Sequence, residues 1–304
     1  MTQSSKTRIV VLGSLNMDVV LRCDTIPARG ETVHAQDLSY IPGGKGGNQA
    51  VACARHGADV ALVGCVGRDA HGEVLRSALA ADGVDVTHVA VRDGVATGSA
   101  VVMVEADGSN RIAVIPGANA QADLPVNFIE VLTHADYLVV QFETPLQVLD
   151  RALMQAHQVG CKVVLNPSPV KSVPSAWWPL LDTLVVNEHE AAELSGMAVT
   201  DADTALRAAQ HFLALGVQQV VVTLGSQGAM ALNTQGHSVH PAPKVHVVDT
   251  TSAGDTFLGT MTTRLGEGCT LAHAVEWGIR AASLCIGRAG AQPSIPQRAE
   301  VEQA

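Results

Sequence analysis

The sequence predicts an α/β fold in which a mostly parallel β-sheet is covered by helices on both faces. Short β-branched runs alternate along the chain with longer amphipathic runs, which is the pattern of successive strand–helix units. Hydrophobic residues make up 47 % of the 304 residues and aromatic residues only 3 %, so the core is expected to be aliphatic. Continuous aliphatic runs suit strands that are buried on both faces.

Each element follows from its local pattern. The predicted strands are the runs RIVVLG (8–13), DVALVG (59–64), SAVVMVE (99–105), YLVVQ (137–141), KVVLN (162–166), TLVVN (183–187) and QVVVTL (219–224). The predicted helices are 48–56, 69–81, 145–159, 188–195, 204–215, 255–265 and 271–286. In the helix at 255–265, for example, Phe257, Met261 and Leu265 share one face at helical spacing. Ligands of such sheets bind at the carboxyl ends of the strands, so the functional site is expected there.

Two regions, 16–40 and 97–115, break this alternation. They contain strand-like stretches and turn signals such as ADGSNR (106–111), with no helix between them. We expect them to form a small antiparallel sheet that projects from the main body as a lid. Because the chain has no internal repeat, low-complexity tract or linker, residues 1–304 are predicted to form a single domain with this lid.

Composition excludes several classes of function. The formal net charge is −10 and no Lys/Arg cluster stands out, which argues against binding to nucleic acid or to an anionic membrane. The six cysteines are scattered, without a C-x-x-C pair or metal-ligand spacing, which favours a reduced cytoplasmic setting. The first apolar run is too short for a signal peptide, and none reaches the roughly 18 residues of a membrane helix.

The glycine-rich run GGKGGNQA (43–50) is not a phosphate-binding P-loop, because Gly46 stands where Ser or Thr must follow the lysine. No G-x-G-x-x-G follows a strand, and NEHEAAEL lacks the second histidine of a zinc-protease helix. Yet four glycines within five residues cost conformational entropy unless something approaches the backbone closely. Their N–H groups, at the start of a helix, could bind polar ligand oxygens; the alternative is a flexible surface loop.

The run VVDTTSAGDTFLGT (247–260) passes from a strand-like end to a helix start through small residues and one carboxylate, Asp255. Two interpretations are open from the pattern alone. Asp255 could cap the helix, with Gly254 easing the turn. Alternatively, the small residues could leave the main chain accessible at a reaction centre.

Six motifs, in order along the chain, resemble the ribokinase (PfkB) family of carbohydrate kinases. They are GSLNMD, PGGKGGNQAVA, NPSP, VVNEHEAAEL, VVTLGSQGA and VDTTSAGDTFLG. FETP (142–145) and GAQPSIP near the C-terminus are most similar to the branch that gives the family its name. Ser252 departs from the broad signature D-T-x-G-A-G-D, in which the position usually holds glycine; we interpret it as a mark of the branch. The resemblance implies a three-layer sandwich with a small β lid.

The resemblance also implies that the chain transfers the γ-phosphate of ATP to a sugar hydroxyl. This reaction needs in-line positioning, neutralisation of charge and a group that accepts the alcohol's proton. Asp255 matches the family's general base. The backbone N–H groups of Ser252, Ala253 and Gly254 match its anion hole, where small side chains let the phosphoryl group approach the main chain. The reaction-centre interpretation is therefore favoured over the helix cap.

The remaining site residues are carried over from the same motifs. Positions that match the family's sugar-binding residues are Asn16, Asp18, Gly44, Lys45, Gly46, Gly47, Asn48 and Glu143, together with Asp255. Amides and carboxylates suit a polyol, because they offer several donors or acceptors for hydroxyl groups. Taken alone, Asp18 could equally be a turn residue and Glu143 a solvated loop charge.

Nucleotide binding is implied in the C-terminal half. The matching positions are Asn187, Glu190, Thr223, Leu224, Gly225, Ser226, Gln227, Gly228 and Gly254. Asn187 and Glu190 belong to an N-x-x-E motif linked to Mg²⁺ and phosphate through water, which suits an ion that gives up water reluctantly. The run 223–228 could alternatively be an ordinary glycine turn into the hairpin strand AMAL (229–232). The family's site for an activating K⁺ matches Asp249, Thr251, Cys285, Arg288, Gly290 and Ser294.

The resulting prediction is ATP-dependent phosphorylation of D-ribose at its 5-hydroxyl, with Mg²⁺ required, K⁺ activating, and a homodimer formed through the lid. The same chemistry on 2-deoxyribose, fructose, adenosine or inosine is the first alternative, although the low aromatic content offers no obvious slot for a nucleoside base. A non-catalytic sugar sensor is the second. It is disfavoured because both Asp255 and Gly254 are present.

Overall fold

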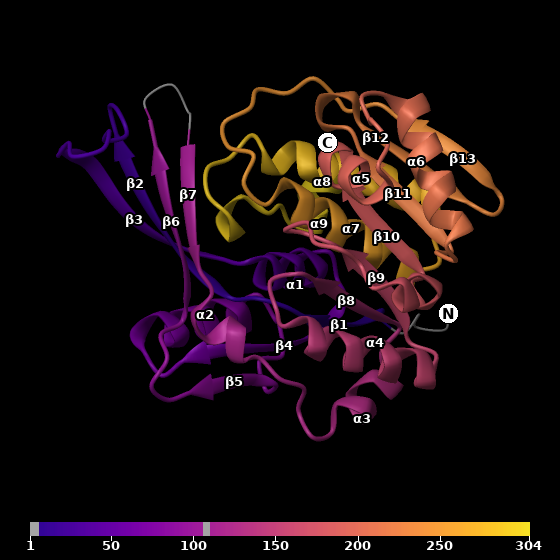
Figure 1. The fold of residues 1–304 in the computed structure, drawn as a ribbon, viewed down its shortest axis with the longest axis horizontal. Helices are drawn as coiled ribbons and strands as arrows, with labels where there is room; N and C mark the ends of the chain where they lie inside the picture. Colours follow the sequence, from indigo (N-terminus) through magenta and orange to yellow (C-terminus); the bar gives the residue numbers. More distant parts are fainter. Residues whose placement is uncertain (1–5, 106–109) are drawn as a thin grey trace.

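The structure, a computed structural model, describes residues 6–105 and 110–304. Within these ranges the main sheet has nine strands in the order β13-β12-β11-β10-β9-β8-β1-β4-β5 (Figure 1). They are β1 Arg8–Leu12, β4 Asp59–Gly67, β5 Val89–Arg92, β8 Tyr137–Gln141, β9 Lys162–Asn166, β10 Thr183–Asn187, β11 Gln219–Thr223, β12 Ala229–Asn233 and β13 Gly236–His240. Neighbours pair in parallel except at β11–β12 and β12–β13. The predicted mostly parallel sheet is confirmed.

Helices cover both faces of this sheet, as the aliphatic strands require. The helices are α1 Lys45–Arg55, α2 Ala70–Ala81, α3 Phe128–Thr133, α4 Leu146–Val159, α5 Glu188–Ser195, α6 Ala202–Ala214, α7 Ala253–Gly266, α8 Leu271–Cys285 and α9 Arg298–Glu302. In strand β1, successive side chains point to opposite faces of the sheet and so enter different cores. Val10 and Leu12 join the core beneath α3 to α6, whereas Ile9 and Val11 join the core beneath α1, α2, α7 and α8. The fold is thus a three-layer sandwich.

All seven predicted helices are present, and α5 has the predicted bounds. Helix α1 begins at Lys45 rather than 48, because two glycines enter its first turn. Helix α7 begins at Ala253 rather than 255, because an alanine and a glycine enter its first turn. The short elements α3, β5 and α9 were not predicted; each is too short to display a period of its own. Single turns of 3₁₀ helix also occur at 117–121, 175–180, 225–227 and 292–294.

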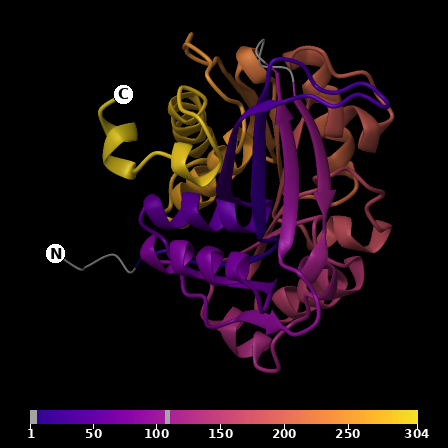
Figure 2. The same cartoon turned by 90° about the vertical axis from the view of Figure 1, so that its left-hand side faces the viewer.

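A second sheet projects from the body (Figures 1 and 2). Its strands, in the order β3-β2-β6-β7, are β2 Asn16–Cys23, β3 Ala35–Gly43, β6 Gly98–Val104 and β7 Asn110–Ile115. The prediction of an antiparallel sheet is wrong in one respect, because β2 and β6 pair in parallel. Both strands start at the main body, with Asn16 opposite Gly98, so they must run in the same direction. The turn predicted at 106–109 lies outside the described residues.

Two further expectations concern the whole chain. No helix within the described ranges has both the length and the apolar character needed to cross a bilayer. All six cysteines, which lie inside those ranges, are free thiols, and five of them are buried. They pack as small apolar side chains.

Candidate active site

Asp255 lies in the first turn of α7 and is not its cap. The N-cap is Ser252, whose φ of +62° makes it the one non-glycine residue with positive φ in the described part of the chain. Because Ser252 makes the turn, the helix begins at Ala253 and places Asp255 one residue beyond Gly254. The helix-cap interpretation of Asp255 is therefore wrong.

The Asp255 carboxylate is buried, with 7 % of the residue exposed, and amide groups of α1 hold both of its oxygens. Asn48 Nδ2 donates to Oδ2 at 3.0 Å, and Gln49 Nε2 donates to Oδ1 at 2.8 Å. Helices α1 and α7 can approach this closely because Gly259 faces Ala52; a Cβ on Gly259 would lie 2.6 Å from the Ala52 Cβ. Asn48 was predicted to face the sugar, and here its amide binds the carboxylate.

Gln49 is held in turn by Gln141 at the end of β8, whose Nε2 donates to Gln49 Oε1. Sequence reasoning missed both glutamines. A signal was available for Gln141, because a polar residue that ends an aliphatic parallel strand points to the ligand-binding edge of the sheet. Gln49 lies inside the glycine-rich motif, next to Asn48.

Three carboxylates surround the amino end of α1. Burial first, and then the charges of Glu143 and Asp255, raise the pKa of Asp18 to about 7. Burial of Lys45 acts to lower its pKa, but the charges of Asp255, Glu143 and Glu190 outweigh it and raise the pKa. The predicted sugar residues Asp18, Lys45 and Glu143 are thus brought together with Asp255: the charges of Glu143 and Asp255 act on both Asp18 and Lys45.

Glu143 and Asn16 are fixed by neighbours that the sequence analysis did not identify. Glu143 Oε2 accepts from the Ser14 hydroxyl and, at 3.3 Å, from the backbone N–H of Lys45, so it is not a solvated loop charge. Asn119 Nδ2 donates to Asn16 Oδ1 at 2.8 Å, and Asn119 Oδ1 accepts from the Leu15 N–H at 2.9 Å. Asn119 lies just after β7, where the chain leaves the small sheet, and it binds residues at the start of β2, where the chain enters that sheet.

The glycines of the 43–47 motif are buried and closely packed, which excludes the flexible surface loop. Gly44 caps α1 with φ +86°, and a Cβ there would lie 2.6 Å from the Asn16 backbone nitrogen. A Cβ on Gly46 would lie 2.6 Å from the Gly13 Cα. Gly46, Gly47 and Asn48 belong to the first turn of α1 rather than to a preceding loop.

The amino end of α7 exposes backbone donors. Ala253 N–H donates to the Thr250 carbonyl at 3.2 Å. Among the described residues, the N–H groups of Gly254 and Asp255 have no hydrogen-bond partner, as is usual in a first helical turn. Gly254 is exposed, and a Cβ there would meet no atom within 4 Å. The space in front of these donors can therefore hold an anion.

The predicted nucleotide residues gather at the carboxyl ends of β10 and β11, where Asn187 and Thr223 are paired in register. Asn187 and Glu190 form a capping box of α5: Asn187 Oδ1 accepts from Glu190 N–H at 2.8 Å, and Glu190 Oε2 from Asn187 N–H at 3.0 Å. Residues 225–227 form an exposed turn, and Gly228 (φ +101°) leads directly into β12. The motif thus also makes the hairpin turn that was its alternative interpretation.

The residues proposed for a monovalent cation form one cluster. The Asp249 carboxylate accepts from Thr251 N–H and Gly290 N–H, each at 2.9 Å. Cys285 Sγ lies 3.0 Å from Ser294 Oγ and 3.7 Å from the Thr251 carbonyl. The Arg288 side chain instead pairs with Glu300 at 2.6 Å, so only its backbone could face the cluster. Across the described ranges, no three His, Cys, Asp or Glu side chains are placed to bind a metal.

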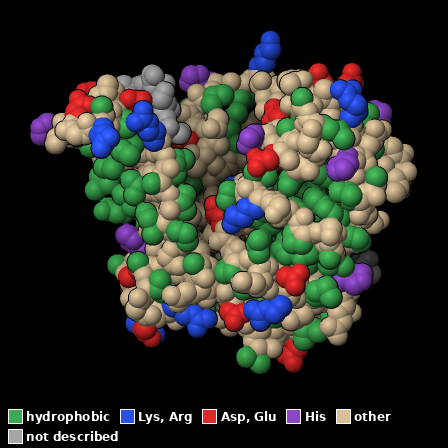
Figure 3. Space-filling view, viewed as in Figure 1, with side chains coloured by type: hydrophobic (Ala, Val, Ile, Leu, Met, Phe, Trp, Pro, Cys, Tyr) green, Lys and Arg blue, Asp and Glu red, His purple; other side chains and the backbone are tan. Residues whose placement is uncertain are grey.

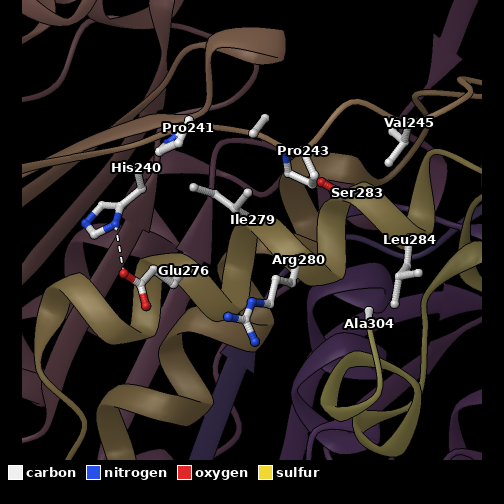
Figure 4. Close-up of a pocket in the computed structure, with 11 residues that line it drawn as sticks. His240, Pro241, Pro243, Val245, Glu276, Ile279, Arg280, Ser283, Leu284 and Ala304 are labelled. Carbon is white, nitrogen blue, oxygen red and sulfur yellow. Dashed lines mark ion pairs between the residues drawn. The ribbon is translucent and has the colours of Figure 1, made fainter.

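A pocket of about 580 Å³ lies between α8 and the segment that follows β13 (Figure 4). Its wall is largely apolar, with Pro243 and Val245 from the segment and Ile279 and Leu284 from α8. The His240–Glu276 ion pair (3.2 Å) lies at its edge. The segment continues to Ser252 and α7. Sequence reasoning missed this pocket, because the segment has no regular pattern. In Figure 3 a hollow also separates the small sheet from the body.

Comparison with known proteins agrees with this geometry. The family model described as pfkB family carbohydrate kinase matches residues 6–298. A ribokinase of Schizosaccharomyces pombe is 39 % identical (97 % of this chain, 96 % of the relative), and one of Haemophilus influenzae is 37 % identical (96 % of each). A structure of Arabidopsis thaliana ribokinase complexed with ribose and ATP superposes with a TM-score of 0.92 at 32 % identity, over 98 % of each chain. The chain therefore belongs to the pfkB family of carbohydrate kinases.

Proposed function

We propose that the protein phosphorylates D-ribose at its 5-hydroxyl with ATP, giving D-ribose 5-phosphate and ADP. The observation that carries this proposal is the position of Asp255. Its buried carboxylate lies beside the backbone N–H groups of Gly254 and Asp255, which have no partner among the described residues, and near Lys45 and Glu143, whose polar side chains suit a sugar. The relatives support the choice of acceptor, since both are ribokinases and the similar Arabidopsis structure holds ribose and ATP.

In this mechanism Asp255 accepts the proton of the attacking hydroxyl. The sugar oxygen forms a bond to the γ-phosphorus while the bond between that phosphorus and the β–γ bridging oxygen breaks, releasing ADP. Of the anion hole predicted at Ser252, Ala253 and Gly254, the Ala253 N–H donates instead to the Thr250 carbonyl. The N–H groups of Gly254 and Asp255 would therefore stabilise the charge on the transferring group, because fixed dipoles need no reorganisation during the reaction. Gly254 is small enough to leave that space open.

The sugar is held by the amino end of α1 and by the small sheet. Asn16, Asp18 and Glu143 would bind its hydroxyl groups, with Lys45 and the backbone of 44–48 completing the site. Lys45 also offsets part of the repulsion among the carboxylates around it. Residues 1–304 would act as one carbohydrate-kinase domain, in which the segments 16–40 and 97–115 close over the sugar and exclude water.

The nucleotide would lie along the C-terminal half, with its phosphates directed at α7. The turn 223–228 and the apolar pocket at Ile279 are the candidates for holding its ribose and base, because the segment that lines the pocket at Pro243 and Val245 leads on to the amino end of α7. Asn187 and Glu190 would hold Mg²⁺ through water, and the ion would neutralise phosphate charge. Their side chains are engaged in the capping box, which favours indirect contact.

A monovalent cation would bind at the cluster around Asp249, where hard oxygen donors would suit it. The Asp249 carboxylate, the Ser294 hydroxyl and the carbonyls of Thr251, Cys285, Arg288 and Gly290 would supply them. Its place beside Ser252 would let K⁺ stabilise the turn that forms the anion site.

The small sheet would also form a homodimer with a second copy. Its exposed large apolar side chains, 47 to 57 % exposed, are Leu38, Tyr40, Ile112, Val114 and Ile115. By the strand register, Leu38, Tyr40 and Ile115 lie on one face of the small sheet and Ile112 and Val114 on the other. Exposed apolar side chains of this kind favour a protein–protein contact, and Figure 3 shows hydrophobic side chains over the small sheet. The free cysteines favour a cytoplasmic location.

An ATP-consumption assay tests the proposal with D-ribose, 2-deoxyribose, fructose, adenosine and inosine, each with and without K⁺. D-ribose is expected to turn over best and Asp255→Ala to be inactive while still binding ribose in calorimetry. If another acceptor turns over best, the proposed mechanism still stands, but ribose is not the preferred substrate. Binding of ribose without turnover of any acceptor would identify a sugar sensor instead.

A further inference from the structure

A buried row of side chains connects the central sheet to Asp255. Gln141 ends β8 and Gln49 lies in α1, and both are 0 % exposed. Gln141 Nε2 donates to Gln49 Oε1 at 2.5 Å, and Gln49 Nε2 donates to Asp255 Oδ1 at 2.8 Å. We propose that Gln49 and Gln141 are positioning residues that fix the carboxylate for proton transfer, an inference that rests on Asp255 being the general base of the proposed function.

Each side chain of this row donates to the next one, from Gln141 through Gln49 to Asp255. If the Gln49 amide were turned over, its oxygen would face Asp255 Oδ1 and its NH₂ would face the NH₂ of Gln141, so both contacts would become repulsive. The Asp255 carboxylate, which only accepts, requires the NH₂ end of the Gln49 amide, and the bond from Gln141 Nε2 to Gln49 Oε1 holds the amide in that orientation. With Asn48 donating to the other oxygen at 3.0 Å, Asp255 cannot rotate without losing both bonds. One lone pair on each oxygen stays available for a substrate hydroxyl.

Packing alone does not account for the glutamine at position 141. Its Oε1 is buried and, among the described residues, has no hydrogen-bond partner, which costs stability. The same oxygen lies against Gly13, where a Cβ would come within 2.3 Å of it and within 2.6 Å of the Gly46 Cα. A methionine of similar length would fill the space without an unpaired oxygen. What methionine cannot do is donate to Gln49.

Loss of the row should therefore act on the chemical step. Gln49→Met is expected to lower kcat about 10- to 100-fold, because small misplacements of a reacting group cost up to about 10²-fold in rate. KM for ribose and ATP should stay within about threefold, since the Gln49 amide is directed at the base. Gln141→Met should lower kcat about fivefold, and should add nothing in the Gln49→Met background, because Gln141 acts through Gln49.

Gln141→Glu provides a second, nearly isosteric test, because it replaces the donor with an acceptor of the same size. It should make two carboxylates compete for the NH₂ of Gln49, so that the bond to Asp255 is weakened or lost and kcat falls as strongly as in Gln49→Met. Gln219→Met is the matched control: Gln219 Nε2 also makes one side-chain hydrogen bond, to Thr183 Oγ1 at 2.7 Å, but at the opposite end of β11 from the site. Its kcat should equal that of the wild type.

The experiment measures steady-state kinetics with D-ribose and ATP, ribose binding by calorimetry and thermal melting of each variant. If Gln49→Met or Gln141→Glu is folded and binds ribose yet keeps kcat within twofold, while Asp255→Ala is inactive, the row does not position the base. If the loss appears in KM instead of kcat, the glutamines act in sugar binding and the inference is wrong. If the wild type does not turn over ribose or any other acceptor, the proposed function itself fails.

Discussion

Asp18 should reduce the stability of the fold at neutral pH, and Asp18→Asn should recover it. The folded protein raises the pKa of Asp18 from 3.8 to about 7, mainly through burial and then through Glu143 and Asp255. Between these values the folded chain holds a proton that the unfolded chain has released, so the free energy of unfolding falls as pH rises. The penalty is absent below about pH 4 and complete above about pH 7.

The size of this penalty follows from the two pKa values. At about 1.4 kcal/mol per pKa unit, it reaches an upper limit of about 4 kcal/mol at pH 8 and about 2 kcal/mol at pH 5. Asparagine has the same shape and stays neutral, so Asp18→Asn should be more stable than the wild type, by an amount that grows from pH 5 to pH 8. Ribose binding should weaken, because the amide replaces a hydroxyl acceptor; stability and function are opposed at this position.

Urea unfolding at pH 5, 6, 7 and 8 measures the difference between the two proteins, and calorimetry measures ribose binding. Asp37→Asn makes the same chemical change at an exposed position of the neighbouring strand β3 and serves as the control. A gain of equal size at pH 5 and pH 8, or a loss of stability at pH 8, would refute the argument that burial of a charge at Asp18 strains the fold.

Two further predictions concern the amino end of α7. Gly254→Ala should leave the free energy of unfolding unchanged or raise it by about 0.5 kcal/mol, because a Cβ at position 254 meets no atom within 4 Å. The same substitution should lower kcat about 10²- to 10³-fold, because the added methyl group fills the anion space. Thermal melting and the ATP assay separate the two effects, and an unchanged kcat would place the phosphoryl group elsewhere. Ser252→Gly should stabilise the protein by about 1 kcal/mol in urea unfolding, because glycine adopts the left-handed backbone conformation of this position without strain. The substitution also removes a buried hydroxyl that has no hydrogen-bond partner among the described residues. A loss of stability would show that this hydroxyl contributes a bond.

Local patterns allowed much of the fold to be predicted. The strands and long helices can be recognised from the pattern of a few residues, and α5 has its predicted bounds because Asn187 and Glu190 cap it. Contacts between distant segments could not be predicted in this way. Gln49 meets Asp255 across 206 residues and Asn119 meets Leu15 across 104, and nothing near either residue encodes its partner. The parallel pairing of β2 with β6 was missed for the same reason.

The order of the layers along the chain has a consequence for biosynthesis. The core beneath α7 and α8 joins Ile9, Val51 and Val60 to Phe257 and Val275, yet every strand of the main sheet is translated before α7 begins. A nascent chain therefore emerges from the ribosome with a complete set of strands and one apolar face that α1 and α2 cover only in part. Chaperones should bind it most strongly in this interval, and a ribosome that stalls just before Ala253 should release a chain that aggregates rather than one that folds.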